Sequence, residues 1–383
     1  MGAAVTEGEG MWIIQGIGRQ AGGDRNTPLV IDVGNSGTTL YLGLAAAASL
    51  GRPVVFTGDA QIRQRPVTAL ISAYEDLGAQ CATDLPADMR DTLNLEPPLK
   101  EGSVPCIITG PLTGGHTSIS CPTSQYLSSL LLAAPLAQGP CTIDVPLLYE
   151  QPYAELTVGW LREQEISFTR DGYRRFHIPG GQQYKPYDKE IPGDYSSASF
   201  FFCAAAVTGS TLTVTSLSCE DPQGDRQILA CLQSMGCEVT WRDSRSVTVT
   251  GPPKGMLQAG AFNLNAMPDT LPVLSVTACF ARGTTRLFEV PQARIKETDR
   301  IAVMCSELRK LGAIVEELED GLVIEGTGEL SGGSACGHGD HRVIMALAVA
   351  ALGSRHGVTI DDTCAAEITF PGFFTILEQI RTN

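Results

Sequence analysis

Five of the seven residues in the segment Arg294-Ile295-Lys296-Glu297-Thr298-Asp299-Arg300 carry a formal charge. A helical pattern follows directly, with apolar residues recurring every three or four positions and a glycine placed to end it: Ile301, Met304, Leu308, Leu311 and Gly312. The charged segment is therefore predicted to form the connection into this helix and its first turn, where free N–H groups and the helix dipole favour anions. If the helix begins early, Lys296 and Arg300 share one face. The alternative is a solvated first turn whose charges neutralise one another.

The composition bounds the possible functions. A length of 383 residues suggests about two domains, and a hydrophobic content of 43% suffices for sizeable cores. The formal net charge of −15 argues against binding to nucleic acid or to anionic membranes, so anionic substrates would need a local cluster of cations. We expect a soluble, cytoplasmic protein, because the sequence has no apolar run of membrane-spanning length and no signal peptide. The 12 cysteines include no C-x-x-C pair, which favours reduced, buried thiols over disulfides or a zinc site.

One pattern recurs along the chain: a helix, a β-rich run, a second helix ending near a glycine, and a pair of strands. Its period of roughly 70–90 residues fits a βαβαββ unit. The copies begin with helices predicted at 40–50, 125–136, 196–207 and 271–281, and a partial copy begins at 343. We therefore predict an α/β fold of two pseudo-symmetric domains, residues 1–185 and 186–383, with the active site in the cleft between them.

Polar segments precede several of the predicted helices. Asn35–Thr38 offers backbone N–H groups and hydroxyls to an oxyanion, and Thr123–Gln125 stands at an equivalent place. Arg63–Pro66 brings guanidinium groups, which suit carboxylates and phosphates. Asp340–Arg342 opens an almost wholly apolar helix, which is unusual for three titratable or charged groups. The alternative for these segments is ordinary helix capping or a solvated turn.

Asp269 precedes another apolar helix, either as its N-cap or as a base whose charge state a cation such as Lys296 would hold. Together with Glu297 it forms a pair of carboxylates among cations, which suits proton transfer between two anionic substrates. The sequence contains no P-loop or Rossmann nucleotide motif and no metal-ligand spacing.

A resemblance to a known family rests on several short segments in order along almost the whole chain. They are Asn35-Ser36-Gly37-Thr38, Arg65-Pro66, Ser124-Gln125, Ser196-Ser197-Ala198-Ser199, Pro268-Asp269, Lys296-Glu297-Thr298-Asp299-Arg300, Asp340-His341-Arg342 and Thr369-Phe370-Pro371. Each is weak alone, but together they make the chain resemble the EPSP synthase family of enolpyruvyl transferases, the 3-phosphoshikimate 1-carboxyvinyltransferases.

The resemblance implies the enolpyruvyl transferase fold and transfer of the enolpyruvyl group of phosphoenolpyruvate to the 5-hydroxyl of shikimate 3-phosphate, with release of phosphate. It implies a monomer that needs no metal and no organic cofactor. By position, phosphoenolpyruvate would be held by Gly37, Arg65, Gln125, Arg300 and Arg342. Shikimate 3-phosphate would be held by Thr123 (usually Ser), Ser124, Gln125, Asp269 and Lys296. Asp269 would take the hydroxyl proton, and Glu297 would handle the proton on the methylene.

The sequence also departs from the family. A Lys-Ser pair that binds both substrates is missing, since the first lysine is Lys100, and the chain starts roughly 50–60 residues late. Tyr41 stands where the family usually has an arginine. Glu150 stands where the family commonly has a serine that contacts the phosphate of the substrate. An acid at position 150 would repel that phosphate. Gln292 replaces a common Asn, and Ile368 a Lys that some members have.

These departures leave alternatives open. The chain could be an active transferase, one that needs a separate N-terminal segment, or a non-catalytic remnant that binds anions or a second chain. The related UDP-N-acetylglucosamine enolpyruvyl transferases are disfavoured, because residues 58–66 contain no cysteine to act as their general acid.

Overall fold

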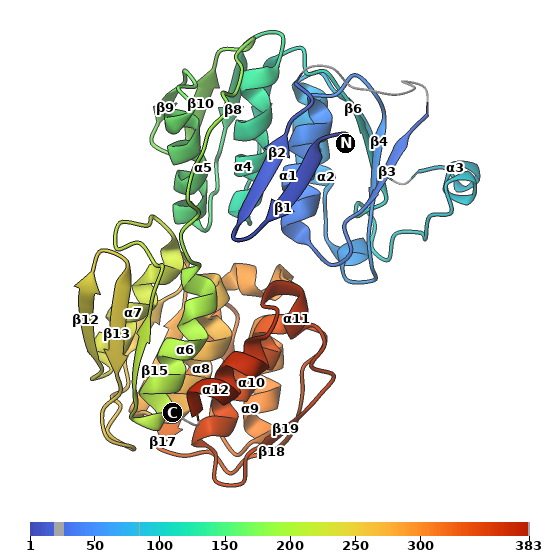
Figure 1. Cartoon of the computed structure of the whole chain (residues 1–383). Helices are drawn as coiled ribbons and strands as arrows, with labels where there is room; N and C mark the ends of the chain where they lie inside the picture. Colours follow the sequence, from blue (N-terminus) through green and yellow to red (C-terminus); the bar gives the residue numbers. More distant parts are fainter. Residues whose placement is uncertain (19–26, 84, 382–383) are drawn as a thin grey trace. The chain divides into compact units, whose positions relative to one another are not determined.

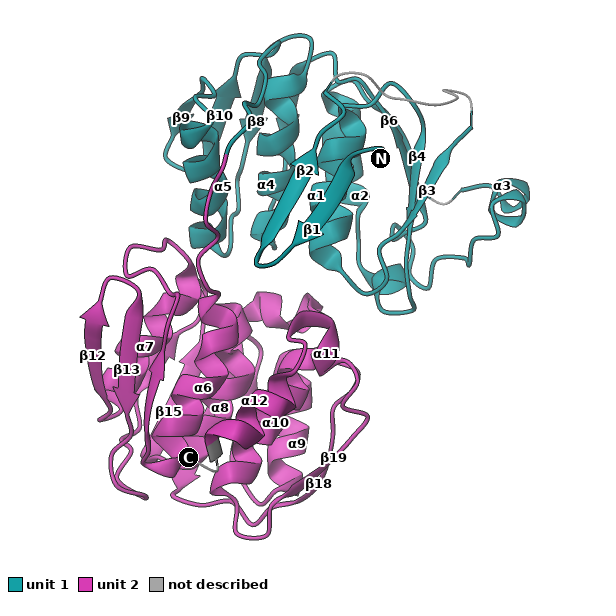
Figure 2. Cartoon of the chain, in the orientation of Figure 1, with its two compact units in different colours: residues 1–187 teal, residues 188–383 magenta. Residues whose placement is uncertain are grey.

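The computed structural model describes residues 1–18, 27–83 and 85–381. The chain divides into two compact units, Met1–Tyr187 and Asp188–Asn383, which Figure 2 colours separately. Each unit has a hydrophobic core of its own, and the core residues of one unit are not shared with the other. The predicted mixed α/β architecture with two domain-sized units is confirmed.

Unit 1 contains two four-stranded sheets with the same topology (Figure 1). The first has the order β3-β4-β6-β5, built from β3 (Leu29–Asp32), β4 (Val54–Thr57), β5 (Gln80–Thr83) and β6 (Cys106–Thr109). The second has the order β7-β8-β10-β9, built from β7 (Gly115–Ser118), β8 (Cys141–Asp144), β9 (Thr169–Asp171) and β10 (Arg175–Ile178). In both sheets the first two strands are parallel and the other pairings are antiparallel.

The helices of unit 1 complete two βαβαββ units. They are α1 (Gly37–Ala48), α2 (Thr68–Asp76), α4 (Ser124–Ala133) and α5 (Gln151–Glu163). A short helix α3 (Ala87–Thr92) and 3-10 turns at Ile62–Gln64 and Ala134–Leu136 lie in the connections. Helix α4 packs against both α1 and α5. The two helices that follow the polar segments Asn35–Thr38 and Thr123–Gln125 are therefore neighbours.

Unit 2 repeats the same strand order in its sheet β14-β15-β17-β16. The elements of this copy are β14 (Ala261–Asn263), α8 (Leu271–Cys279), β15 (Arg282–Phe288), α9 (Arg300–Lys310), β16 (Ile314–Leu318) and β17 (Gly321–Thr327). A second copy has the order β11-β13-β12, from α6 (Tyr195–Thr208), β11 (Thr211–Val214), α7 (Ile228–Ser234), β12 (Glu238–Asp243) and β13 (Ser246–Thr250). The last copy is the parallel pair β18 (Gly333–Cys336) and β19 (Val358–Asp361), with α10 (His341–Gly353), α11 (Ala366–Thr369) and α12 (Phe373–Arg381). The predicted internal repeat is thus visible as a repeated topology.

An antiparallel hairpin, β1 (Ala4–Gly8) and β2 (Met11–Gln15), forms a separate two-stranded sheet. All ten residues of the hairpin are exposed, and the apolar side chains of Trp12, Ile13 and Ile14 are 69%, 57% and 61% exposed.

The centre of unit 2 is a group of almost wholly apolar helices. Every residue of α8 is buried, because this helix packs against α6, α9 and α10 (Figure 1). In α6, α8 and α10, charged residues occur only in the first turn or in the segment before the helix, whereas α9 also carries charges in its last turn. The packing of the helices therefore gathers their polar N-terminal ends.

Candidate active site

In unit 2 the site begins at the N-terminus of α9. Asp299 caps this helix by accepting a hydrogen bond from the Ala302 N–H at 3.0 Å, so the helix starts at Arg300. Lys296 lies before the helix in extended backbone, so the early helix start under which Lys296 and Arg300 would share one face does not occur. Both side chains nevertheless reach one carboxylate, with Lys296 Nζ 3.9 Å and Arg300 Nη1 2.7 Å from Asp269 Oδ1.

Arg300 is the hub of the unit 2 site. Its side chain is only 1% exposed, and its guanidinium contacts three carboxylates. The distances are 2.7 Å to Asp269, 2.6 Å to Glu297 and 2.9 Å to Asp340. Burial acts to lower the pKa of Arg300, but the charges of Asp340, Glu297 and Asp269 outweigh it and raise the pKa above its ordinary value. A permanently charged arginine thus fixes the predicted acid–base pair, Asp269 and Glu297, around one group.

Asp340 is a member of this cluster that the sequence prediction did not assign to the site. It is fully buried and caps α10 by accepting a hydrogen bond from the Arg342 N–H at 2.9 Å. It also accepts hydrogen bonds from Arg300 Nε at 2.9 Å and from the Thr298 hydroxyl at 3.0 Å. An acid directly before an apolar helix was the available signal, and its second role could not be seen without the fold.

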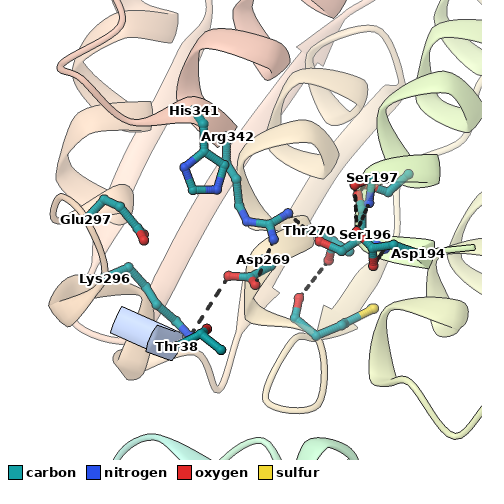
Figure 3. A network of polar contacts seen from close by, with 12 residues as sticks. Thr38, Asp194, Ser196, Ser197, Asp269, Thr270, Lys296, Glu297, His341 and Arg342 are labelled. Carbon is teal, nitrogen blue, oxygen red and sulfur yellow. Dashed lines mark hydrogen bonds and ion pairs between the residues drawn. The ribbon is translucent and has the colours of Figure 1, made fainter. Parts of the chain in front are cut away.

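Asp269 does not cap α8, so that alternative is wrong. It lies in a 3-10 turn, Pro268–Thr270, and no side chain caps the helix that follows. Figure 3 shows Arg342 and Lys296 on either side of its carboxylate, with Arg342 Nη2 3.1 Å from Oδ2. Burial acts to raise the pKa of Asp269, but Arg342, Lys296 and Arg300 together hold that pKa well below its usual range.

Helix α6 adds a further polar group to the unit 2 site. Arg342 donates to the hydroxyl of Ser196 on the first turn of α6, and Asp194 caps that helix through the N–H groups of Ser196 and Ser197, both at 3.0 Å (Figure 3).

His341, next to Arg342, is buried. Desolvation, with the charges of Arg342 and Arg300, lowers the pKa of His341 to about 4, so its imidazole is neutral at physiological pH.

In unit 1, Gly37 and Arg65 form one contact. Gly37 is the first residue of α1, and a Cβ on it would lie 2.2 Å from Arg65 Nη1. The guanidinium of Arg65 therefore lies directly against the N-terminus of α1, where both the charge and the helix dipole favour an anion. Arg63 has a structural role instead: it donates to the Pro97 carbonyl at 2.8 Å.

The predicted residues on α4 are linked to α1. Gln125 Nε2 donates to the hydroxyl of Thr38 at 3.1 Å, and its Oε1 is buried with no hydrogen-bond partner among the described residues. Thr123 caps α4 by accepting a hydrogen bond from the Gln125 N–H at 3.4 Å. The N-termini of α1 and α4 thus form a second polar cluster, within unit 1.

Glu150 changes the character of this second cluster. Its carboxylate accepts hydrogen bonds from the Ser124 N–H at 3.2 Å, the Ser124 hydroxyl at 3.0 Å and the Thr123 hydroxyl at 3.4 Å. The substituted Tyr41 is buried and its ring makes an edge contact with Tyr126 at 5.1 Å between centroids. The carboxylate of Glu150 thus accepts hydrogen bonds from the donors that the family resemblance assigns to shikimate 3-phosphate.

Other kinds of site are not found in the described residues. No group of three or more His, Cys, Asp or Glu residues in residues 1–18, 27–83 and 85–381 has a geometry that could hold a metal ion. Within the same ranges, no helix is both long and apolar enough to cross a membrane. The 12 cysteines are all free thiols, as predicted, and most are buried.

Several known proteins are similar to this chain in fold and in sequence. A solved EPSP synthase from Acinetobacter baumannii superimposes with a TM-score of 0.77 at 26% identity, over 99% of this chain and 84% of the other. The 3-phosphoshikimate 1-carboxyvinyltransferase of Ruminiclostridium cellulolyticum is 45% identical over 90% of this chain and 77% of its own length. That of Acetivibrio thermocellus is 42% identical over 99% of this chain and 84% of its own length.

A model of one family matches almost the whole chain. The match covers residues 1–377, and the family is described as EPSP synthase (3-phosphoshikimate 1-carboxyvinyltransferase). With relatives above 40% identity that are covered over three quarters of their length or more, this match is decisive. The chain therefore belongs to the EPSP synthase family.

Proposed function

We propose that this chain transfers the enolpyruvyl group of phosphoenolpyruvate to the 5-hydroxyl of shikimate 3-phosphate and releases phosphate. The observation that carries the proposal is the placement of two carboxylates, Asp269 and Glu297, on the single buried guanidinium of Arg300 at 2.7 and 2.6 Å. The reaction needs one group that removes a proton from the hydroxyl and another that moves a proton at the methylene carbon. Two carboxylates fixed by one cation meet that need.

The proposed binding residues follow from the charges of each unit. Arg300 and Arg342 in unit 2, and Arg65 with the N-terminus of α1 at Gly37 in unit 1, are suited to the carboxylate and phosphate of phosphoenolpyruvate. Shikimate 3-phosphate is assigned to hydroxyl, amide and charged groups: Thr123, Ser124, Gln125, Asp269 and Lys296. The buried Oε1 of Gln125, which has no hydrogen-bond partner among the residues that the structure describes, would accept a hydrogen bond from a substrate hydroxyl.

Addition and elimination would proceed without an external reactant. The 5-hydroxyl oxygen bonds to C2 of phosphoenolpyruvate as Asp269 takes the hydroxyl proton, and C3 gains a proton from the protonated carboxyl group of Glu297 to become a methyl group. In the second step Glu297 takes a proton back from the methyl group, the C2–O bond to phosphate breaks, and the enol double bond re-forms. The departing phosphate receives the proton that Asp269 had taken. Arg300 and Arg342 are placed to stabilise the negative charge that moves onto phosphate.

Binding of phosphoenolpyruvate would also adjust Asp269 as a base. Arg300 and Arg342, which contact Asp269 at 2.7 and 3.1 Å, hold its pKa low. An anionic substrate competes for these same guanidinium groups and weakens their hold on Asp269. Its pKa would then rise toward the range in which a carboxylate accepts a proton, so the base becomes effective only with the substrate in place.

The test is phosphate release by the purified chain with both substrates, with the enolpyruvyl product identified by mass spectrometry. We expect release only when both substrates are present, and a loss of about 100-fold or more in Glu297→Gln. The matched control is Glu316→Gln, an exposed acid on β16 of the same unit. A normal rate in Glu297→Gln would remove Glu297 from its role. Absence of release by a folded wild-type chain would favour a non-catalytic, anion-binding protein.

A further inference from the structure

Glu150 is the residue whose position the proposed reaction does not explain. It is 2% exposed, and its carboxylate oxygen Oε2 takes hydrogen bonds from three donors of Ser124 and Thr123 at 3.0–3.4 Å. These donors lie at the N-terminus of α4, a helix of 10 residues. A helix N-terminus with two hydroxyls is a place that favours a negatively charged group. In this chain the negatively charged group at that place is the carboxylate of Glu150.

The backbone of Glu150 shows that this placement is specific. Glu150 precedes α5 with a φ of 59°, in the left-handed region that non-glycine residues seldom adopt. Such a conformation costs free energy and persists where the surrounding structure holds it. In this conformation the side chain of Glu150 reaches Ser124, which is 26 positions away in the sequence.

We infer that Glu150 is a specificity-determining residue that occupies the place of the acceptor substrate's phosphate at the N-terminus of α4; the inference rests on the function proposed above. Ser124 and Thr123 can donate to the carboxylate or to a phosphate, but not fully to both. A phosphate dianion beside the carboxylate is also repelled by it. Binding of shikimate 3-phosphate therefore requires Glu150 to leave these donors.

The inference predicts a gain of affinity when Glu150 is replaced. Glu150→Ser removes the charge and leaves a hydroxyl, and Glu150→Gln keeps the size of the side chain and removes only the charge. Calorimetric titration should show shikimate 3-phosphate binding about 10- to 100-fold tighter to Glu150→Ser than to wild type, and a smaller gain for Glu150→Gln. Affinity for phosphoenolpyruvate, assigned to Arg65 and unit 2, should change less than about twofold.

Two controls test whether the change in affinity depends on the phosphate group of the substrate. Shikimate, which lacks only the phosphate, should bind wild type and variants equally. Glu163→Ser makes the same replacement at an exposed position at the other end of α5 and should leave shikimate 3-phosphate affinity unchanged. Circular dichroism and a denaturant titration establish that each variant is folded.

The outcomes separate this inference from the proposed reaction. Tighter binding of shikimate 3-phosphate, but not shikimate, to the Glu150 variants supports the inference whether or not the chain turns over. Unchanged or weaker binding of shikimate 3-phosphate to both folded variants overturns it, even where wild type releases phosphate. An equal gain for shikimate and shikimate 3-phosphate also overturns it, because the effect would then not concern the phosphate.

Discussion

The two units treat charge in opposite ways. In unit 2, cations and carboxylates neutralise one another inside the protein: Arg300, 1% exposed, contacts Asp269, Glu297 and Asp340. In unit 1, the donors at the N-terminus of α4 meet the carboxylate of Glu150. The first arrangement holds together the groups that the proposed proton transfers need, and we infer that the second opposes binding of a phosphate. The comparison shows that one fold can bury a balanced cluster of charges in one unit and hold a single carboxylate at a helix N-terminus in the other.

The largest expected effect follows from removing the hub of unit 2. Arg300→Met leaves three buried or partly buried carboxylates without their shared cation. We expect the free energy of unfolding of unit 2 to fall by about 3–5 kcal/mol, measured by urea denaturation. Arg282→Met, at an exposed position on β15, is the control and should change it by less than about 0.5 kcal/mol. Equal stability of the two variants would mean that the charge cluster does not hold the unit together.

The next effect concerns the anion site of unit 1. In Gly37→Ala the new Cβ would lie 2.2 Å from Arg65 Nη1, so the guanidinium must move away from the N-terminus of α1. We expect KM for phosphoenolpyruvate to rise about 10-fold with a smaller change in kcat, since about 1.4 kcal/mol of binding is a factor of ten. Gly159→Ala, in α5 with nothing within 4 Å of the new Cβ, should leave KM unchanged. A normal KM in Gly37→Ala would show that Arg65 does not bind this substrate.

A further effect should appear in the dependence of unit 2 stability on pH. The pKa of His341 is lowered from 6.5 to about 4 in the folded protein, so between these values the unfolded chain binds a proton that the folded chain does not. Stability should therefore fall as pH drops through this window, by up to about 3 kcal/mol from His341. His341→Gln should lose this part of the slope, and His356→Gln, at an exposed position in the same unit, should keep it. The same slope in both variants would contradict burial of a neutral His341.

Much of the fold could be predicted because the repeat places strong periodic signals at regular intervals. The helices predicted at 196–207 and 271–281 coincide to within two residues with α6 and α8. The short helix α3 and the three-residue strand β14 were not predicted, since such segments are too brief for a period to show. The strand order common to three sheets is a long-range property, and no local pattern carries it.

For the candidate site, the sequence could supply a list of candidate residues but not the contacts among them. The segment before α9 identified Lys296, Glu297 and Arg300 from charge alone. The contact of Arg300 with Asp340 joins residues 40 positions apart, and it depends on the packing of α9 and α10. Glu150 was predicted to repel a phosphate, but its hydrogen bonds with Ser124 depend on a backbone conformation that the sequence does not signal.

The most direct test of the account is the rate of phosphate release at saturating phosphoenolpyruvate as shikimate 3-phosphate is varied, for wild type and Glu150→Ser side by side. The account predicts release by both proteins, with similar kcat and a KM for shikimate 3-phosphate about 10-fold or more lower in the variant. Similar kcat would show that Glu150 takes no part in the chemical step, and a lower KM would show that Glu150 opposes binding of the phosphate. No release by either protein, with both folded and both substrates present, would contradict the central claim.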